Sequence, residues 1–251
     1  MEINDTLNTY EEWIASPEGT SIETRTHELV STLLPSTGGK RLLGVGCKTG
    51  RDLVFFRNLG YLVTGTETSR VLIDAARQKI SPGIDLHLGD SEDLPFSDSE
   101  FDVVAIMTSL ESTENPLQAI REAVRVSRAR VVLTLINHAS PFAQRIRTTS
   151  FPAPAFHSFR VFEALRLVRA AMPGVPVEWG SIVFFPAGWY PRAEDIDRKI
   201  PWRKNPFGSI AGISFPVTYQ FRTLQEPLGA NVEVRLRENR RVPGTACNRE
   251  R

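Results

Sequence analysis

The feature that most constrains the fold is an alternation of short apolar runs with amphipathic stretches in this 251-residue chain. The apolar runs predict β-strands, and the stretches between them carry apolar residues at helical spacing. The predicted strands are 41–45, 61–67, 84–90, 101–107 and 130–136, and the predicted helices are 51–60, 69–80 and 115–127. Repeated strand–helix–strand units form parallel sheets with right-handed crossovers. The chain is therefore expected to adopt a doubly wound α/β fold.

The segments on either side of this pattern are less regular. Residues 22–34 and 156–170 predict two further helices, and 177–186 and 213–223 predict two late strands. We expect the following organisation: N-terminal cap helices in 1–36, an α/β core in 37–147, a C-terminal part of the same domain with a lid or substrate segment in 148–232, and a flexible tail in 233–251.

Charge and cysteine usage exclude several classes of protein. The net charge of +1 argues against a nucleic-acid binder, which usually carries a basic excess. No apolar run approaches the ~20 residues that span a bilayer, and the acidic N-terminus lacks the pattern of a secretory signal. Cys47 and Cys247 lie far apart, and neither they nor the four histidines have metal-ligand spacing. A cytoplasmic protein without a metal site is expected.

A glycine-rich loop follows the first predicted strand and leads into a helix. Gly44, Gly46 and Gly50 allow a sharp turn and a close approach of the backbone to a ligand. The free amides at the start of the next helix suit an anionic or zwitterionic group. A dinucleotide fingerprint would need a third glycine at position 49, where this chain has Thr49. This spacing argues against a nicotinamide or flavin enzyme, although the loop alone also fits a purely structural turn.

Two acidic residues follow the second and third predicted strands. Glu67 lies 21 residues after Gly46, where an ionised carboxylate can accept both hydroxyls of a ribose. Asp90 follows the third strand, where it could accept from an adenine amino group, with the Ser91 amide beside it. The competing interpretations are a surface glutamate for Glu67 and a turn or cap residue for Asp90.

Three ordered motifs carry a family resemblance. LLGVGCKTGRDLVFFRNLGYLVTGTETS, GDSEDLPFSDSEFDVV and ENPLQAIREAVRVSRARVVLTLIN together resemble the class I methyltransferases that use S-adenosylmethionine (SAM). The similarity is greatest to the branch of quinone-biosynthesis and small-molecule methyltransferases, and it covers about residues 8 to 147. It implies a Rossmann-like, mostly parallel seven-stranded sheet with a final antiparallel strand and helices on both faces. It also implies SAM as the cofactor and a small molecule as the methyl acceptor.

The resemblance further implies which residues contact SAM. Gly46, Cys47 and Gly50 would line its methionine part, Glu67 would hold the ribose, and Thr68 would lie beside the adenine. The remaining candidates are Asp90 and Ser91 at the adenine edge, Met107 and Thr108 beside the transferring methyl group, and Tyr10 above the pocket. The resemblance does not indicate which molecule accepts the methyl group, which of its atoms is methylated, or what the oligomeric state is.

The chain departs from the family pattern at two positions in the loop. Gly44 stands where relatives usually have an acid, and Lys48 stands where they usually have glycine. A cation at position 48 would lie near a ligand that already carries a sulfonium charge, unless the Lys48 side chain points outward or meets the carboxylate of SAM. The main hypothesis is therefore a SAM-dependent methyltransferase, and the alternative is a domain of the same fold that has lost catalysis and acts as a binding or regulatory module.

Methyl transfer from a sulfonium mainly requires positioning of the reactants and exclusion of water. Glu111 and His138 are the candidates for a general base, and each also fits a structural role. Aromatic residues of the second half could cover an apolar acceptor or belong to the core: Phe151, Phe156, Trp179, Trp189, Tyr190 and Trp202.

Overall fold

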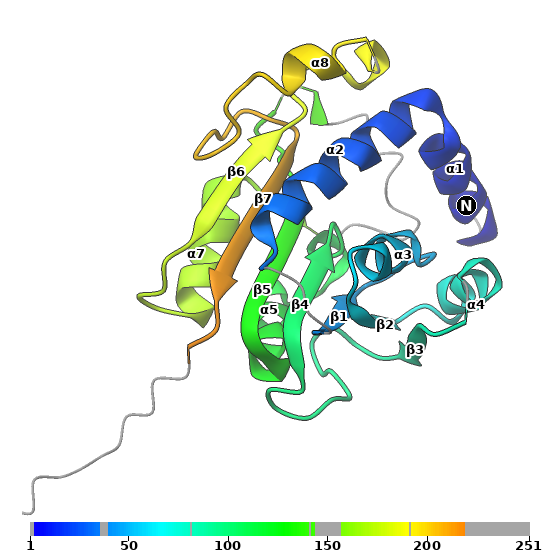
Figure 1. Ribbon diagram of the computed structural model, residues 1–251, viewed down its shortest axis with the longest axis vertical. Coiled ribbons are helices and arrows are strands. Elements are labelled where there is room, and N and C mark those ends of the chain that lie inside the picture. Colours follow the sequence, from blue (N-terminus) through cyan, green and yellow to red (C-terminus); the bar gives the residue numbers. More distant parts are fainter. Residues whose placement is uncertain are drawn as a thin grey trace, which may run out of the picture. The chain divides into compact units, whose positions relative to one another are not determined.

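A seven-stranded sheet forms the centre of the structure. The structure is a computed structural model, and it describes residues 3–35, 40–80, 82–140, 142–143, 157–190 and 192–218. The strands are β1 (Arg41–Val45), β2 (Leu62–Glu67), β3 (Asp85–Leu88), β4 (Phe101–Met107), β5 (Ser127–Ile136), β6 (Glu178–Ile182) and β7 (Ile210–Pro216). Their order in the sheet is β3-β2-β1-β4-β5-β7-β6 (Figure 1). β7 runs antiparallel to both of its neighbours, and the other pairs are parallel.

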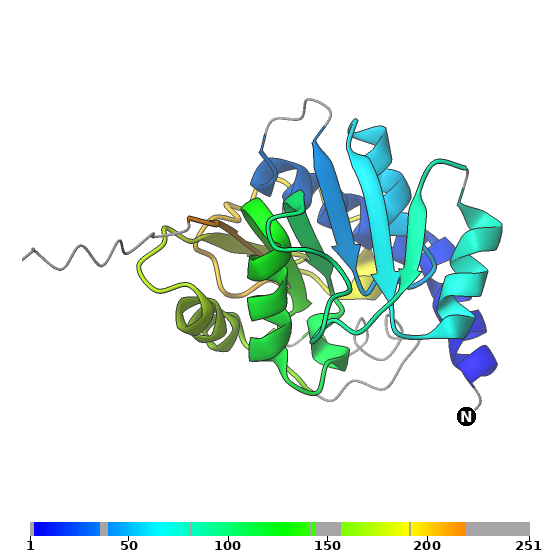
Figure 2. The ribbon, with the colours of Figure 1, turned by 90° about the horizontal axis from the view of Figure 1, so that it is seen from below.

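Helices lie on both faces of this sheet (Figure 2). They are α1 (Ile3–Ala15), α2 (Pro17–Leu33), α3 (Arg51–Asn58), α4 (Arg70–Lys79), α5 (Pro116–Val126), α7 (Val161–Ala171) and the short α8 (Glu194–Asp197). Apolar residues of α2 and α3 pack on one face of the sheet, and those of α5 and α7 pack on the other. The expected fold, mostly parallel with a late antiparallel strand and helices on both faces, is confirmed.

The helix boundaries follow from local sequence chemistry. The hydroxyl of Ser69 accepts from the Leu72 amide and caps α4, as side-chain oxygens do at helix N-termini. Asn115 caps α5, and Pro116 occupies its first turn, where no amide partner is needed. Gly60 adopts φ +91° after α3, a left-handed conformation that favours glycine at a helix end. These capping residues set where α4 and α5 begin and where α3 ends.

Two strands begin earlier than the sequence predicts, because residues before the predicted start pair with a neighbouring strand. β5 begins at Ser127, three residues earlier than predicted, since Ser127 is buried and pairs with Phe101. β7 begins at Ile210 rather than 213, because Ile210 pairs with Ile136 on one side and Ile182 on the other. Within the described residues, no helix combines the length and apolar character that a membrane crossing requires.

Candidate functional site

The glycine-rich loop turns back over the carboxyl ends of β1, β2 and β4. Gly46 and Gly50 adopt φ +65° and +83°. A Cβ atom at Gly46 would collide with the Ser109 side chain, so both the space and the backbone require glycine there. The Cys47 amide donates to the Thr66 carbonyl oxygen at 3.0 Å, which fixes the loop against β2.

Glu67, at the end of β2, faces this loop. Its side chain is buried, and its Oε2 atom accepts from the Lys48 backbone amide at 2.9 Å. Its Oε1 atom accepts from the amides of Thr68 at 3.0 Å and Ser69 at 3.1 Å. Three backbone amides therefore fix the orientation of this carboxylate. The sequence prediction placed Glu67 beside the loop, and the structure brings the two into direct contact.

Lys48 links the loop to β4. Its ammonium donates to Thr108 Oγ1 at 2.8 Å and to the Met107 carbonyl oxygen at 3.3 Å. The side chain is buried, and burial lowers the pKa of Lys48 although Asp52, Glu111 and Glu67 oppose that effect. Three separate parts of the sequence therefore meet in one cluster: Lys48 of the loop after β1, Glu67 at the end of β2, and Met107 and Thr108 at and after the end of β4.

A pocket opens beside the Lys48 ammonium. Helices α1 and α2 form one wall, and the ends of β4, β5 and β7 form another. Its lining residues are Tyr10, Trp13, Ile14, Ile22, Glu23, Thr26, His27, Lys48, Asp52, Met107, Thr108, Ile136 and Ile210. Tyr10 is a predicted site residue, and burial is the largest cause of the rise in its pKa. The pocket is mainly apolar at α1 and carries charged groups toward the loop.

A histidine–aspartate pair in this pocket was not predicted from the sequence. His27 Nε2 lies 2.9 Å from Asp52 Oδ1, and the His27 ring stacks on Phe55 with centroids 3.9 Å apart. Burial alone would raise the pKa of Asp52, but the hydrogen bond from His27 and the nearby cations lower it overall. The two residues lie on different helices, α2 and α3, and no motif marks either of them.

Asp90 and Ser91 follow β3, which pairs with β2 on the side away from β1. The exposed Asp90 accepts from the Glu92 amide at 2.9 Å, which is the turn role considered for it. That bond uses Oδ1, so the turn role and a ligand role for the carboxylate remain compatible. Arg125 donates to the carbonyl oxygens of Leu94 and Phe96, which fixes this loop onto α5.

The two candidate bases differ in their surroundings. Glu111 is 1% exposed, its Oε1 atom accepts from the Ile136 amide at 2.8 Å, and its Oε2 atom has no hydrogen-bond partner among the described residues. Burial raises the pKa of Glu111. His138 is exposed, and its backbone amide donates to Phe159. Neither side chain belongs to the described wall of the pocket.

Replacement of Glu111 with Gln should change the pH dependence of stability. Because the folded-state pKa of Glu111 lies above its unfolded value, its contribution is fully present below about pH 4, near the ordinary glutamate pKa, and is lost as pH rises through the folded pKa. Relative to Glu111→Gln, the wild type should therefore lose free energy of unfolding as pH rises. Denaturant unfolding from pH 4 to pH 8 tests this, and parallel curves for the two proteins would contradict it.

The aromatic residues of the second half, for which a lid and a place in the core were both considered, do not line the pocket where the structure describes them. Tyr190 is buried, Trp189 is 61% exposed, and Trp179 and Trp202 pack against the apolar clusters on the two faces of the sheet. None of these four lines the pocket, and Phe151 and Phe156 lie outside the described residues. Trp13 of α1 lines it instead, with its indole Nε1 buried and without a partner among the described residues.

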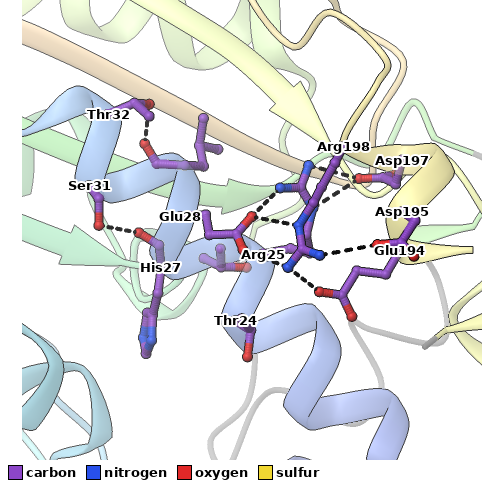
Figure 3. Close-up of polar contacts among 12 residues, drawn as sticks. Thr24, Arg25, His27, Glu28, Ser31, Thr32, Glu194, Asp195, Asp197 and Arg198 are labelled. Atoms are coloured by element: carbon purple, nitrogen blue, oxygen red, sulfur yellow. Dashed lines mark hydrogen bonds and ion pairs between the residues drawn. The ribbon is translucent and has the colours of Figure 1, made fainter.

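A network of ion pairs holds α2 against α8 (Figure 3). Arg25 donates to Asp197 Oδ2 from Nη2 at 3.1 Å and from Nε at 3.3 Å, and Asp197 is fully buried. Asp197 Oδ1 also accepts from the Phe184 amide at 2.8 Å. On the exposed side, Arg198 pairs with Glu28 at 2.7 Å. The network fixes the helix that carries Glu23, Thr26 and His27 of the pocket wall.

Residues 43–135 match the family model described as a methyltransferase domain. The demethylmenaquinone methyltransferase of Renibacterium salmoninarum is 28% identical over 58% of this chain and 56% of its own length. The 27-O-demethylrifamycin SV methyltransferase of Amycolatopsis mediterranei is 29% identical over 42% of this chain and 41% of its own. The chain thus spans about half the length of these relatives.

The fold is also similar to solved structures. A SAM-dependent methyltransferase of Thermotoga maritima, described as a possible histamine N-methyltransferase, superposes with a TM-score of 0.67 over 84% of this chain and 96% of that one. Its sequence is 22% identical, so this likeness concerns the fold alone.

Proposed function

We propose that the chain is a class I SAM-dependent methyltransferase that transfers a methyl group from SAM to a small-molecule acceptor. The match of residues 43–135 to a methyltransferase domain, the similar relatives and the similar fold support this proposal. The observation that carries this proposal is the contact between Glu67 and the glycine-rich loop. An oriented, buried carboxylate next to a loop that requires glycine suits a ribose and the chain attached to it. SAM supplies the reactive methyl group on its sulfonium.

The proposed binding residues follow the carboxyl ends of β1 to β4, with Tyr10 added from α1. They are Gly46, Cys47, Gly50, Glu67, Thr68, Asp90, Ser91, Met107, Thr108 and Tyr10. In this arrangement the residues position donor and acceptor and exclude water, which is the main requirement of an in-line displacement. An acceptor that loses a proton on methylation needs a base, and the pocket wall offers the His27–Asp52 pair.

We propose an apolar acceptor of the quinone or phenol type. The part of the pocket formed by Tyr10, Trp13, Ile14 and Ile136 is aromatic and aliphatic, and such walls bind flat apolar molecules. The similarity to a demethylmenaquinone methyltransferase supports the same class. We further propose a cytoplasmic location and no nucleic-acid partner, in keeping with the two distant cysteines and the net charge of +1.

Titration calorimetry with SAM and S-adenosylhomocysteine tests the proposal directly. We expect micromolar binding of at least one of the two ligands, and transfer of a labelled methyl group to one of a panel of quinones, phenols and small acids. NADH serves as the control ligand, because the glycine spacing argues against a dinucleotide site. A folded protein that binds neither SAM nor its demethylated product would contradict the proposal and favour a non-catalytic binding module.

A further inference from the structure

The connection between β6 and β7 turns several apolar side chains toward solvent. Among the described residues, three of the seven exposed large apolar side chains belong to this one connection: Trp189 at 61%, Ile196 at 57% and Phe207 at 74%. Trp189 closes the 3₁₀ turn η2 (Ala187–Trp189), and Ile196 belongs to α8. Single apolar residues at a surface are ordinary, but their concentration in one segment indicates an interaction site.

Helix-type hydrogen bonds link Trp189 to α8 and α8 to the residues after it. The amides of Ala193 and Asp197 each donate to the carbonyl oxygen four residues earlier, at 3.2 and 2.9 Å, and the Ile200 amide donates to Asp197 at 3.0 Å. Residues three or four positions apart therefore share a side of this segment. On its inner side, Tyr190, Ala193 and Asp197 are buried.

The opposite side consists of exposed residues three or four positions apart, and we call it the outer face: Trp189, Arg192, Ile196 and Lys199. A segment that faces only water would turn its aspartate outward and its tryptophan and isoleucine inward. Here the order is reversed, because the inner Asp197 is fully buried and pairs with Arg25 of α2 (Figure 3). The fold therefore holds Trp189 and Ile196 at the surface.

The outer face also carries positive charge. In the part of the chain that the structure describes, neither Arg192 nor Lys199 forms an ion pair with an acidic side chain. The acidic neighbours Glu194 and Asp195 pair with Arg198 instead, at 2.5 and 3.4 Å. Two cations thus flank two apolar side chains, and no anion of the segment is left to neutralise them.

We propose that the outer face docks the protein on a membrane surface that contains anionic lipids. Tryptophan is favoured at the boundary between lipid headgroups and acyl chains, and anionic headgroups attract nearby arginine and lysine. The apolar stems of Arg192 and Lys199 let their charges stay among the headgroups while Trp189 and Ile196 enter below them. A protein partner fits this face less well, because lysine is depleted at protein interfaces.

The position of the outer face connects this docking to the pocket. α2 lies between the two, since its Arg25 holds Asp197 of α8 while its Ile22 and Thr26 line the pocket (Figure 1). An apolar acceptor partitions into bilayers, so docking at this face would bring the pocket close to it. The choice of a lipid surface as partner therefore rests in part on the apolar acceptor proposed above.

Co-sedimentation of the full chain with lipid vesicles tests the proposal. We expect the wild type to bind vesicles of equal parts phosphatidylcholine and phosphatidylglycerol at least about tenfold more tightly than vesicles of phosphatidylcholine alone. Trp189→Ser combined with Ile196→Ser should weaken binding to the mixed vesicles by about tenfold or more. Arg192→Gln combined with Lys199→Gln should reduce the preference for the mixed vesicles to about threefold or less.

Matched double variants outside the connection serve as controls. Leu88→Ser with Phe162→Ser removes two apolar side chains that are each 55% exposed, and Arg121→Gln with Arg166→Gln removes two exposed cations of α5 and α7. Both should bind the mixed vesicles as the wild type does. Thermal unfolding of every variant reports whether the fold survives.

A wild type that binds neither kind of vesicle would overturn the proposal, and so would equal binding by the wild type and the variant that lacks Trp189 and Ile196. A dimer of the wild type that dissociates in this variant would assign the outer face to a second copy of the chain and overturn it as well. Calorimetry with SAM is independent of the vesicles. A protein that docks on vesicles but does not bind SAM contradicts the proposed function alone.

Discussion

Replacement of Glu67 with Ala should weaken SAM binding by at least about 100-fold, because two hydrogen bonds from ribose hydroxyls to a charged carboxylate contribute about 1.5 kcal/mol each at the low end of their usual range, or about 3 kcal/mol together. The Glu67 carboxylate is buried and oriented by the amides of Lys48, Thr68 and Ser69. Its loss therefore removes both the acceptor and the order of the loop. Calorimetry with S-adenosylhomocysteine measures this effect without interference from turnover.

Two further variants separate these contributions. Glu67→Gln retains one acceptor oxygen but no charge, so we expect about a tenfold loss of affinity, between the wild type and Glu67→Ala. Asp74→Ala removes an exposed carboxylate on α4 and should bind as the wild type does. Thermal unfolding of each variant reports whether the fold survives. Unchanged affinity in a folded Glu67→Ala protein would refute the proposed ribose site.

Replacement of Arg25 with Met should lower the free energy of unfolding by about 3–5 kcal/mol, the usual result of removing one partner of a buried ion pair. Asp197 is fully buried, and in this variant it would keep the amides of Val183 and Phe184 but lose its cation. Denaturant unfolding measures the change. Affinity for ligands should fall as well, because Arg25 fixes the helix that carries His27.

Arg198→Met is the matched control, since it removes an arginine of the same network that is 41% exposed. Exposed pairs such as Arg198 with Glu28 contribute about 0–1 kcal/mol, so this variant should lose little stability. If Arg25→Met and Arg198→Met lose equal amounts of free energy of unfolding, the burial of Asp197 does not decide how much the network stabilises the protein.

Local signals predicted much of the fold and of the loop cluster. The run FDVVAIM is a strand with the predicted bounds 101–107, and Ser69 caps the helix after β2 as expected. Glu67 was found because its distance from the glycine-rich loop reflects one strand–helix–strand unit. The roles of the proposed SAM-binding residues, and the domain bounds, stay predictions.

Long-range contacts left no such signal. Arg25 and Asp197 are separated by 172 residues, and in the sequence each resembles an ordinary charged residue at the surface. His27 and Asp52 meet only because α2 packs beside α3, and Ile210 joins a strand because β5 and β6 pair with it. Periodicity reports which face of an element is apolar, but it does not report which element covers that face.

The position of α2 also sets the order in which the protein can assemble. Part of its apolar face packs with residues of β6 and β7, and its Arg25 pairs with Asp197, and these partners all belong to the last fifth of the described residues. During synthesis the chain emerges from its N-terminus, so the contacts of α2 with β6, β7 and Asp197 can form only after the sheet from β1 to β5 has been made. Such distant pairings slow folding. The wall that encloses the pocket is therefore among the last parts of a newborn molecule to close.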